Sequence, residues 1–273
     1  MIVRDAGDRW LLIRQTDHAE QCGRMASHWG NDQFAMPVAA DAVMVGAALH
    51  DTGWREWEDG QQTGAILVEG DTGEPRTFYR VRGKEHFDLY RRGIQRTLAV
   101  DPYAGLLVSM HGVGLHNGRY GRTPDSADPD AGDPASPAGQ FIAEQARLQQ
   151  ELRLRLQADP CYRDAATDVA VWNNYQLLQV WDLLSLHLCM RALGDGEIPQ
   201  TPLTPGGALV NLQLTARGNY TLALDPYPFD RSPLLVGIKA LVIPKERYLD
   251  NAALLVAMQR AQSVTLPFEL VAP

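Results

Sequence analysis

The chain has 273 residues, 45% of them hydrophobic, and a formal net charge of −8. This apolar share is enough for a substantial core, and the acidic balance argues against a nucleic-acid-binding surface. No apolar window has the length of a membrane span, and the first residues do not resemble a signal peptide. We therefore expect a cytoplasmic protein without nucleic-acid or membrane partners. The scattered cysteines predict neither a disulfide framework nor a CxxC metal motif.

The first two thirds of the chain predict mostly helices. Residues 1–14 have the pattern of a β-hairpin, and Thr16 is a suitable N-cap for a helix that ends near Gly30. A helix is expected from about Asp41 to Asp51, and from Val43 to Leu49 it is apolar on every side, as in a helix buried in a core. Asp101-Pro102 is a helix start signal. Further helices are expected at 85–98, 103–116, 140–157 and 168–193.

Two other regions have a different composition. Residues 122–139 are rich in Pro, Asp, Ala and Gly without a large apolar side chain, so we expect a mobile surface loop. After Pro199 the pattern alternates, which predicts strands at 208–214, 220–224, 234–243 and 264–271 and a short helix at 251–262.

The whole pattern predicts an α+β fold, with a mainly helical body and a β accessory layer from the N-terminal hairpin and the C-terminal strands. The expected division is a helical domain at 1–198 and a β-rich accessory region at 199–273.

Histidines and carboxylates are placed on the apolar helices in a way that predicts a metal site. His18 opens the first helix, and His50 and Asp51 end the second. Asp182 lies inside an apolar run, where an unpaired carboxylate is expensive to bury. His111 lies on another apolar helix. It is either a site residue or a core histidine whose ring nitrogens have hydrogen-bond partners. Together these groups form a mixed nitrogen and oxygen site suited to one or two divalent transition metals, Fe, Mn or Zn.

The remaining histidines are weaker candidates. His86 and His116 lie near helix ends or loops, and we keep them as possible ligands of a second metal. His187 follows Asp182 by five residues, about 140° around the helix, so both cannot easily face one metal. His28 is expected on the surface.

Two stretches resemble the HD superfamily of metal-dependent phosphohydrolases. They are Asp17-His18-Ala19-Glu20 and Ala47-Ala48-Leu49-His50-Asp51-Thr52-Gly53. Two more, 101–112 and 225–229, make the chain similar to a bacterial domain-of-unknown-function family allied to HD proteins. The resemblance implies an HD-like helical body in which His18, His50, Asp51 and Asp182 are metal ligands.

The leading hypothesis from this resemblance is a phosphohydrolase that acts on a small phosphate ester through a metal-activated water. Asp51 would serve the metal centre, and Arg55 would hold the substrate phosphate. An alternative is a diiron oxygenase similar to myo-inositol oxygenase, with ligands His18, His50, Asp51, His86, His111 and Asp182. A third is a degenerate HD body used for binding or scaffolding. The sequence identifies neither the substrate nor the oligomeric state.

Overall fold

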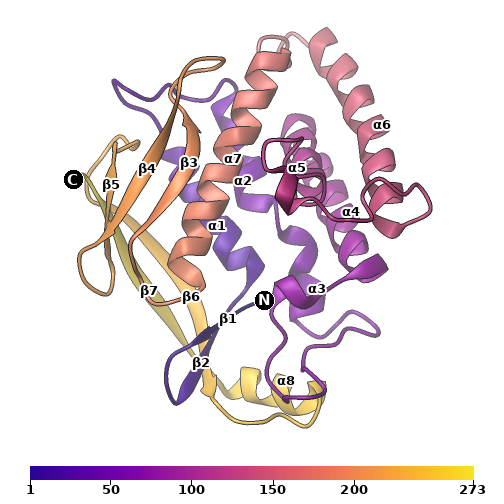
Figure 1. Ribbon diagram of the computed structural model, residues 1–273, viewed down its shortest axis with the longest axis vertical. Coiled ribbons are helices and arrows are strands. Elements are labelled where there is room, and N and C mark those ends of the chain that lie inside the picture. The colour runs from indigo at the N-terminus through magenta and orange to yellow at the C-terminus, as the bar shows by residue number, and fades with distance from the viewer.

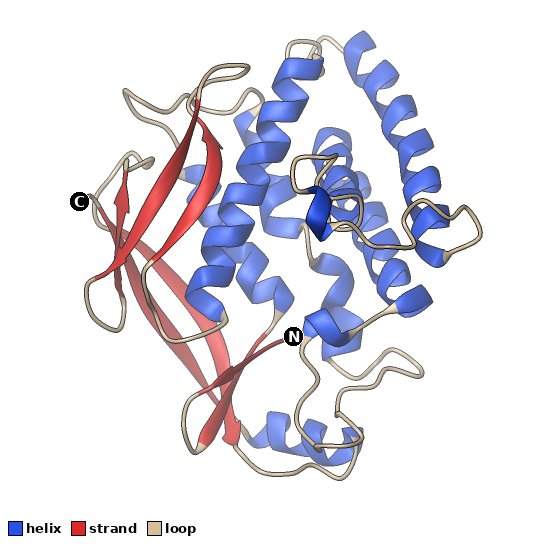
Figure 2. Cartoon of the chain, in the orientation of Figure 1, coloured by secondary structure: helices blue, strands red, loops and turns tan.

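The computed structural model describes residues 1–273, with a curled sheet on one side and a group of helices on the other (Figures 1 and 2). Helices hold 44% of the residues, and the seven strands form one mixed sheet that curls into a half-barrel. The molecule is α+β, but the expected mainly helical HD-like body with an accessory β layer is wrong. The sheet is a principal layer of the fold.

The sheet combines strands from both ends of the chain in the order β1-β2-β6-β7-β5-β4-β3. Neighbouring strands are antiparallel except β5 and β7, which are parallel. The strands are β1 (Ile2–Asp5), β2 (Arg9–Ile13), β3 (Gly196–Pro202), β4 (Leu209–Ala216), β5 (Thr221–Asp225), β6 (Leu234–Pro244) and β7 (Gln262–Val271).

The helices are α1 (Gln15–Ser27), α2 (Ala40–Leu49), α3 (Arg55–Glu58), α4 (Gly83–Val100), α5 (Pro102–Gly114), α6 (Pro137–Ala158), α7 (Asp168–Cys189) and α8 (Asn251–Arg260). Short 3-10 turns occur at Thr52–Trp54, Phe78–Arg80 and Pro124–Ser126. The predicted cap at Asp101 is confirmed, because its Oδ1 accepts a hydrogen bond from the amide of Ala104. Thr16 is not a cap, since α1 begins one residue earlier. None of the helices combines the length and apolarity needed to cross a membrane.

One core joins the two layers. Helix α1 packs on β6 and α7 packs on β3, and a single cluster of 40 buried residues includes Trp29, Trp181 and Phe268. Helices α1 and α2 approach closely at Gly23, where an added Cβ would lie 2.6 Å from the Cβ of Ala48. This contact brings the end of α2 towards α1 and α7.

The sequence predicts only an accessory β layer because the paired strands of the sheet lie far apart in the chain. Trp10 on β2 pairs with Ile243 on β6, and no local pattern predicts such a partner. Strand β3 was missed because Pro199 and Pro202 lie in it, and proline argues against a strand. Residues 122–139 contain only one 3-10 turn besides the start of α6; their mobility stays a prediction, as does the domain boundary at residue 198.

Candidate metal centre

Four helices place the predicted ligands around one buried point. His18 lies on α1, Asp182 on α7 and His111 on α5, while His50 and Asp51 follow the last residue of α2. All five residues are buried, each with less than a twentieth of its surface exposed. The structure thus brings together residues that are up to 164 positions apart.

The two nearest histidines each have one ring nitrogen fixed by a partner. His18 Nδ1 is 2.7 Å from Ser185 Oγ, and this hydroxyl donates to the carbonyl of His18 at 3.2 Å. The Ser185 oxygen must therefore accept from Nδ1. His50 Nδ1 donates to the carbonyl of Ala47 at 2.8 Å. With the proton held on Nδ1, the neutral ring of each histidine has a free lone pair on Nε2.

Both Nε2 atoms face the same two carboxylates. His18 Nε2 lies 3.1 Å from Asp182 Oδ1 and 4.0 Å from Asp51 Oδ2. His50 Nε2 lies 3.5 Å from Asp51 Oδ2 and 3.6 Å from Asp182 Oδ1. Metal–ligand bonds of about 2.1 Å place neighbouring ligand atoms about 3 to 3.5 Å apart. The four nitrogen–oxygen separations, from 3.1 to 4.0 Å, are close to this spacing.

The cluster also contains buried polar atoms without hydrogen-bond partners, which native proteins rarely leave unpaired. They are His50 Nε2, Asp51 Oδ1 and His111 Nδ1. In metal sites, the ring nitrogen of a histidine that does not bind the metal is usually held by a hydrogen bond. Ser185 and the carbonyl of Ala47 hold Nδ1 of His18 and His50 in this way. The residues present therefore fit a divalent transition metal.

The charges of the cluster require a cation. Burial raises the pKa of Asp51 above its ordinary value. Burial also disfavours the charged form of His50, but Asp51 and then Asp182 outweigh it and raise its pKa to about 9. Burial opposes the ionised form of Asp182 too, yet the hydrogen bond with His18 and the nearby imidazole of His50 hold its pKa well below its usual range. In the protein alone, protonated imidazole supplies the positive charge that the carboxylates need.

His111 and Cys22 extend the cluster in two directions. Ligand atoms of His50, Asp51 and His111 lie within 4.8 Å of one another, and so do those of His18, Cys22 and His50. Burial and then the charge of His50 lower the pKa of His111 to about 3, so its ring stays neutral and able to bind a metal. Burial keeps Cys22 a thiol by raising its pKa, which disfavours it as a ligand. Cys22 is not among the ligands predicted from the sequence, although it lies one turn after His18.

The histidines proposed for a second metal form a separate pair. His86 Nε2 lies 3.2 Å from His116 Nε2, and His116 Nδ1 lies 3.5 Å from Asp128 in the loop. The rings of Trp54 and Tyr90 lie against His86. Neither histidine forms a ring contact, hydrogen bond or ion pair with the five clustered residues.

Arg55, the predicted phosphate ligand, is exposed at the start of α3, and its side chain forms no hydrogen bond or ion pair. An arginine that the sequence did not indicate lies nearer the cluster. Arg119 donates to Gln179 Oε1 at 2.5 Å, and its charge contributes, after burial and His50, to the low pKa of His111. Arg119 follows α5 in a left-handed conformation with φ of 51°, in a loop without a recognisable motif.

The two excluded histidines lie elsewhere. His187 Nε2 donates to the carbonyl of Gly194 at 2.8 Å, and His28 pairs with Asp230 at 3.2 Å near the sheet. Neither contacts the clustered residues, which agrees with their exclusion on spacing and position.

A family model described as "Protein of unknown function (DUF3891)" matches residues 1–245. No curated protein and no solved structure matches the chain. The match bears out the resemblance to a family of unknown function, and it provides no assignment to the HD superfamily.

Proposed function

For this chain, which belongs to the DUF3891 family, we propose a metal-dependent phosphohydrolase that acts on a small phosphate ester. His18, His50, Asp51 and Asp182 would hold Fe, Mn or Zn, with His111 as a further ligand. One observation carries the proposal: two Nε2 atoms and two carboxylate oxygens converge in a buried space, while Ser185 and Ala47 hold the Nδ1 protons.

The order of the ligands supports the same activity. A histidine, a His-Asp pair and a distant aspartate resemble the metal ligands of the HD superfamily, many of whose members hydrolyse phosphate esters. The likeness lies in the ligand residues and their sequence order, and it supports the proposed chemistry but not an HD fold.

The residues of the cluster suit hydrolysis. A bound divalent metal lowers the pKa of a water and polarises a phosphoryl oxygen. Asp51 Oδ1 has no hydrogen-bond partner, so it is free to accept a proton from that water. The burial of all five residues excludes bulk solvent and strengthens the electrostatic interactions within the site.

The test is an activity screen on the purified protein, loaded separately with Fe²⁺, Mn²⁺ and Zn²⁺, with p-nitrophenyl phosphate, bis-p-nitrophenyl phosphate and nucleotides as substrates. Asp51→Ala should abolish both metal content and hydrolysis, whereas Asp32→Ala, at an exposed aspartate, should change neither. Hydrolysis retained by Asp51→Ala with bound metal would overturn the proposal.

Two other results would replace it. Bound iron with oxygen consumption and no phosphatase activity would favour the diiron oxygenase. A protein that takes up no metal at micromolar concentrations would favour a binding or scaffolding role.

A further inference from the structure

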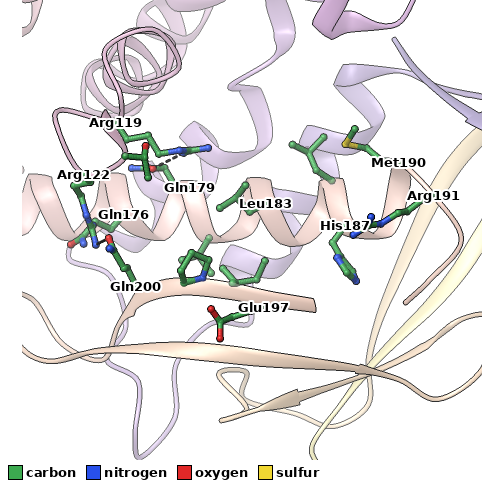
Figure 3. A pocket seen from close by; sticks show the side chains of 15 residues that line it. Arg119, Arg122, Gln176, Gln179, Leu183, His187, Met190, Arg191, Glu197 and Gln200 are labelled. Carbon is green, nitrogen blue, oxygen red and sulfur yellow. Dashed lines mark hydrogen bonds between the residues drawn. The ribbon is translucent and has the colours of Figure 1, made fainter. Parts of the chain in front are cut away.

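A cavity of about 690 Å³ lies between α7, β3 and the loop after α5 (Figure 3). Its α7 wall includes Gln176, Gln179, Leu183, Leu186, His187 and Met190. These residues recur at intervals of three and four, so they form one face of the helix. Leu183, near the middle of this face, is turned about 100° from Asp182, so the face is centred away from the metal cluster. The volume is typical of a small-molecule site.

One end of the cavity holds two arginines without acidic partners. Arg119 donates to Gln179 Oε1 at 2.5 Å, and Arg122 donates to Gln200 Oε1. Neither forms an ion pair, although both side chains are partly buried. Figure 3 shows both on the same side of the cavity, together with Gln176. Neither guanidinium has a carboxylate partner, although that of Arg122 also lies over the ring of Trp172 at 5.7 Å. Both therefore remain available to a carboxylate or phosphate, which arginine binds in a bidentate manner.

The middle of the cavity is apolar. Leu183 and Leu186 of α7 face Ile198 and Pro199 of β3 across it. The α7 wall runs from Gln176 to Met190, about 21 Å along the helix axis. This shape suits an extended ligand with one charged end.

The other charged groups leave the arginine end positive. Glu197 is the only carboxylate on the cavity wall, and its Oε2 accepts a hydrogen bond from Gln213. His187 and Arg191 lie at the far end (Figure 3), where His187 Nε2 is already bound to Gly194. No acidic group thus neutralises Arg119 or Arg122.

We propose that this cavity binds an amphipathic organic anion, with its phosphate or carboxylate at Arg119 and Arg122 and its apolar chain along Leu183 and Leu186. The site goes beyond the proposed hydrolysis and does not depend on it, because none of these residues is a metal ligand. Binding is therefore expected with or without a metal.

The test is isothermal titration calorimetry of the full chain with four probes, each below its aggregation concentration. They are decyl phosphate, decanoate, decan-1-ol and decyltrimethylammonium, whose chains each have ten carbons. We expect an anion to bind at least about tenfold more tightly than the alcohol or the cation, since a hydrogen bond to a charged group contributes about 1.5–3 kcal/mol. Comparison of the two anions identifies the preferred head group.

Variants locate the site. Arg119→Gln and Arg122→Gln should each weaken the preferred anion at least about tenfold, while Arg155→Gln, at an exposed arginine of α6, should not. The same titration on Asp51→Ala should give the wild-type affinity, so that loss of the metal site and loss of this site are distinguished. Equal binding of the alcohol, no binding of either anion, or full affinity in both arginine variants would overturn the proposal.

Discussion

The hydrogen bonds to the outer nitrogens of His18 and His50 determine what the buried cluster can bind. Ser185 and the carbonyl of Ala47 hold the Nδ1 protons, so both neutral rings direct a lone pair at the carboxylates of Asp51 and Asp182. A lone pair beside a carboxylate is repulsive unless a proton or a metal lies between them. The cluster is therefore built to hold positive charge.

Ser185→Ala tests the role of the hydrogen bond between Ser185 and Nδ1 of His18. Without the hydroxyl, His18 Nδ1 loses its acceptor and the ring loses its fixed orientation, so metal affinity should fall about 10–100-fold. Competition with a chelator of known affinity measures the change. Ser27→Ala, which removes an exposed hydroxyl at the end of α1, the helix of His18, is the matched control. An unchanged affinity in Ser185→Ala would mean that this bond does not orient the ligand.

Individual residues differed in how far the sequence could predict them. His50 and Asp51 stand out because they end an apolar helix, and Asp182 because it interrupts an apolar run. Ser185 and Arg119 carry no such contrast with their neighbours. Their positions become informative only when α1, α5 and α7 are packed together.

At the scale of elements, the turn after Asp51 depends on a close contact between two backbones. Gly53 lies against α4, and an added Cβ would be 1.9 Å from the carbonyl oxygen of Leu89 and 2.8 Å from the amide of Gly93. Backbone atoms of a packed helix cannot move aside cheaply. The glycine therefore sets the distance between α4 and the residues that follow the His-Asp pair.

Gly53→Ala should destabilise the protein by about 1–3 kcal/mol, as overpacking does, and should weaken metal binding by displacing Asp51. Chemical denaturation gives the first value and metal titration the second. Gly132→Ala is the control, because an added Cβ there meets nothing within 4 Å; its stability should change by less than about 0.5 kcal/mol. Wild-type stability in Gly53→Ala would contradict the role of this contact.

Elements were predicted best where the signal is local. The Asp101 cap marks the start of α5 correctly, and the alternation at 220–224 identifies β5 almost to the residue. Strand β3 was not predicted because it contains Pro199 and Pro202, and proline argues against a strand. In the structure its pairing with β4 shifts register between Ile198 and Thr201, and this irregularity accommodates Pro199.

At the scale of the whole molecule, the sheet changed the interpretation most. Alternating strands near the end of the chain predicted a peripheral layer, but β6 packs on α1 and β7 contributes to the same core. The parallel pairing of β5 with β7 connects segments without a local turn between them. Such contacts depend on the folded chain, so the convergence of His18, His50, Asp51 and Asp182 was easier to predict than the architecture.

Buried histidines make the stability of the whole molecule depend on pH. Burial, followed by His116, lowers the pKa of His86 from 6.5 to about 3. Between these values the unfolded chain binds a proton at this residue and the folded protein does not. Stability should therefore fall as the pH drops from about 6.5 towards 3, by up to about 1.4 kcal/mol per pH unit for this group.

His86→Gln should make this acid loss shallower by up to about 1.4 kcal/mol per pH unit, measured by denaturant titrations of metal-free protein between pH 4 and 7. The control is His28→Gln, near the sheet and outside both histidine clusters. If His86→Gln kept the wild-type slope, His86 would have to be protonated in the folded protein.

The most direct test of the metal centre is the metal content of the purified chain, measured by inductively coupled plasma mass spectrometry after incubation with Fe²⁺, Mn²⁺ or Zn²⁺ and removal of free metal. We predict at least one ion per wild-type chain and none in Asp182→Asn, with both proteins folded by circular dichroism. A wild-type protein that retains no metal, or an Asp182→Asn variant that retains as much as the wild type, would contradict the assignment of His18, His50, Asp51 and Asp182 as ligands.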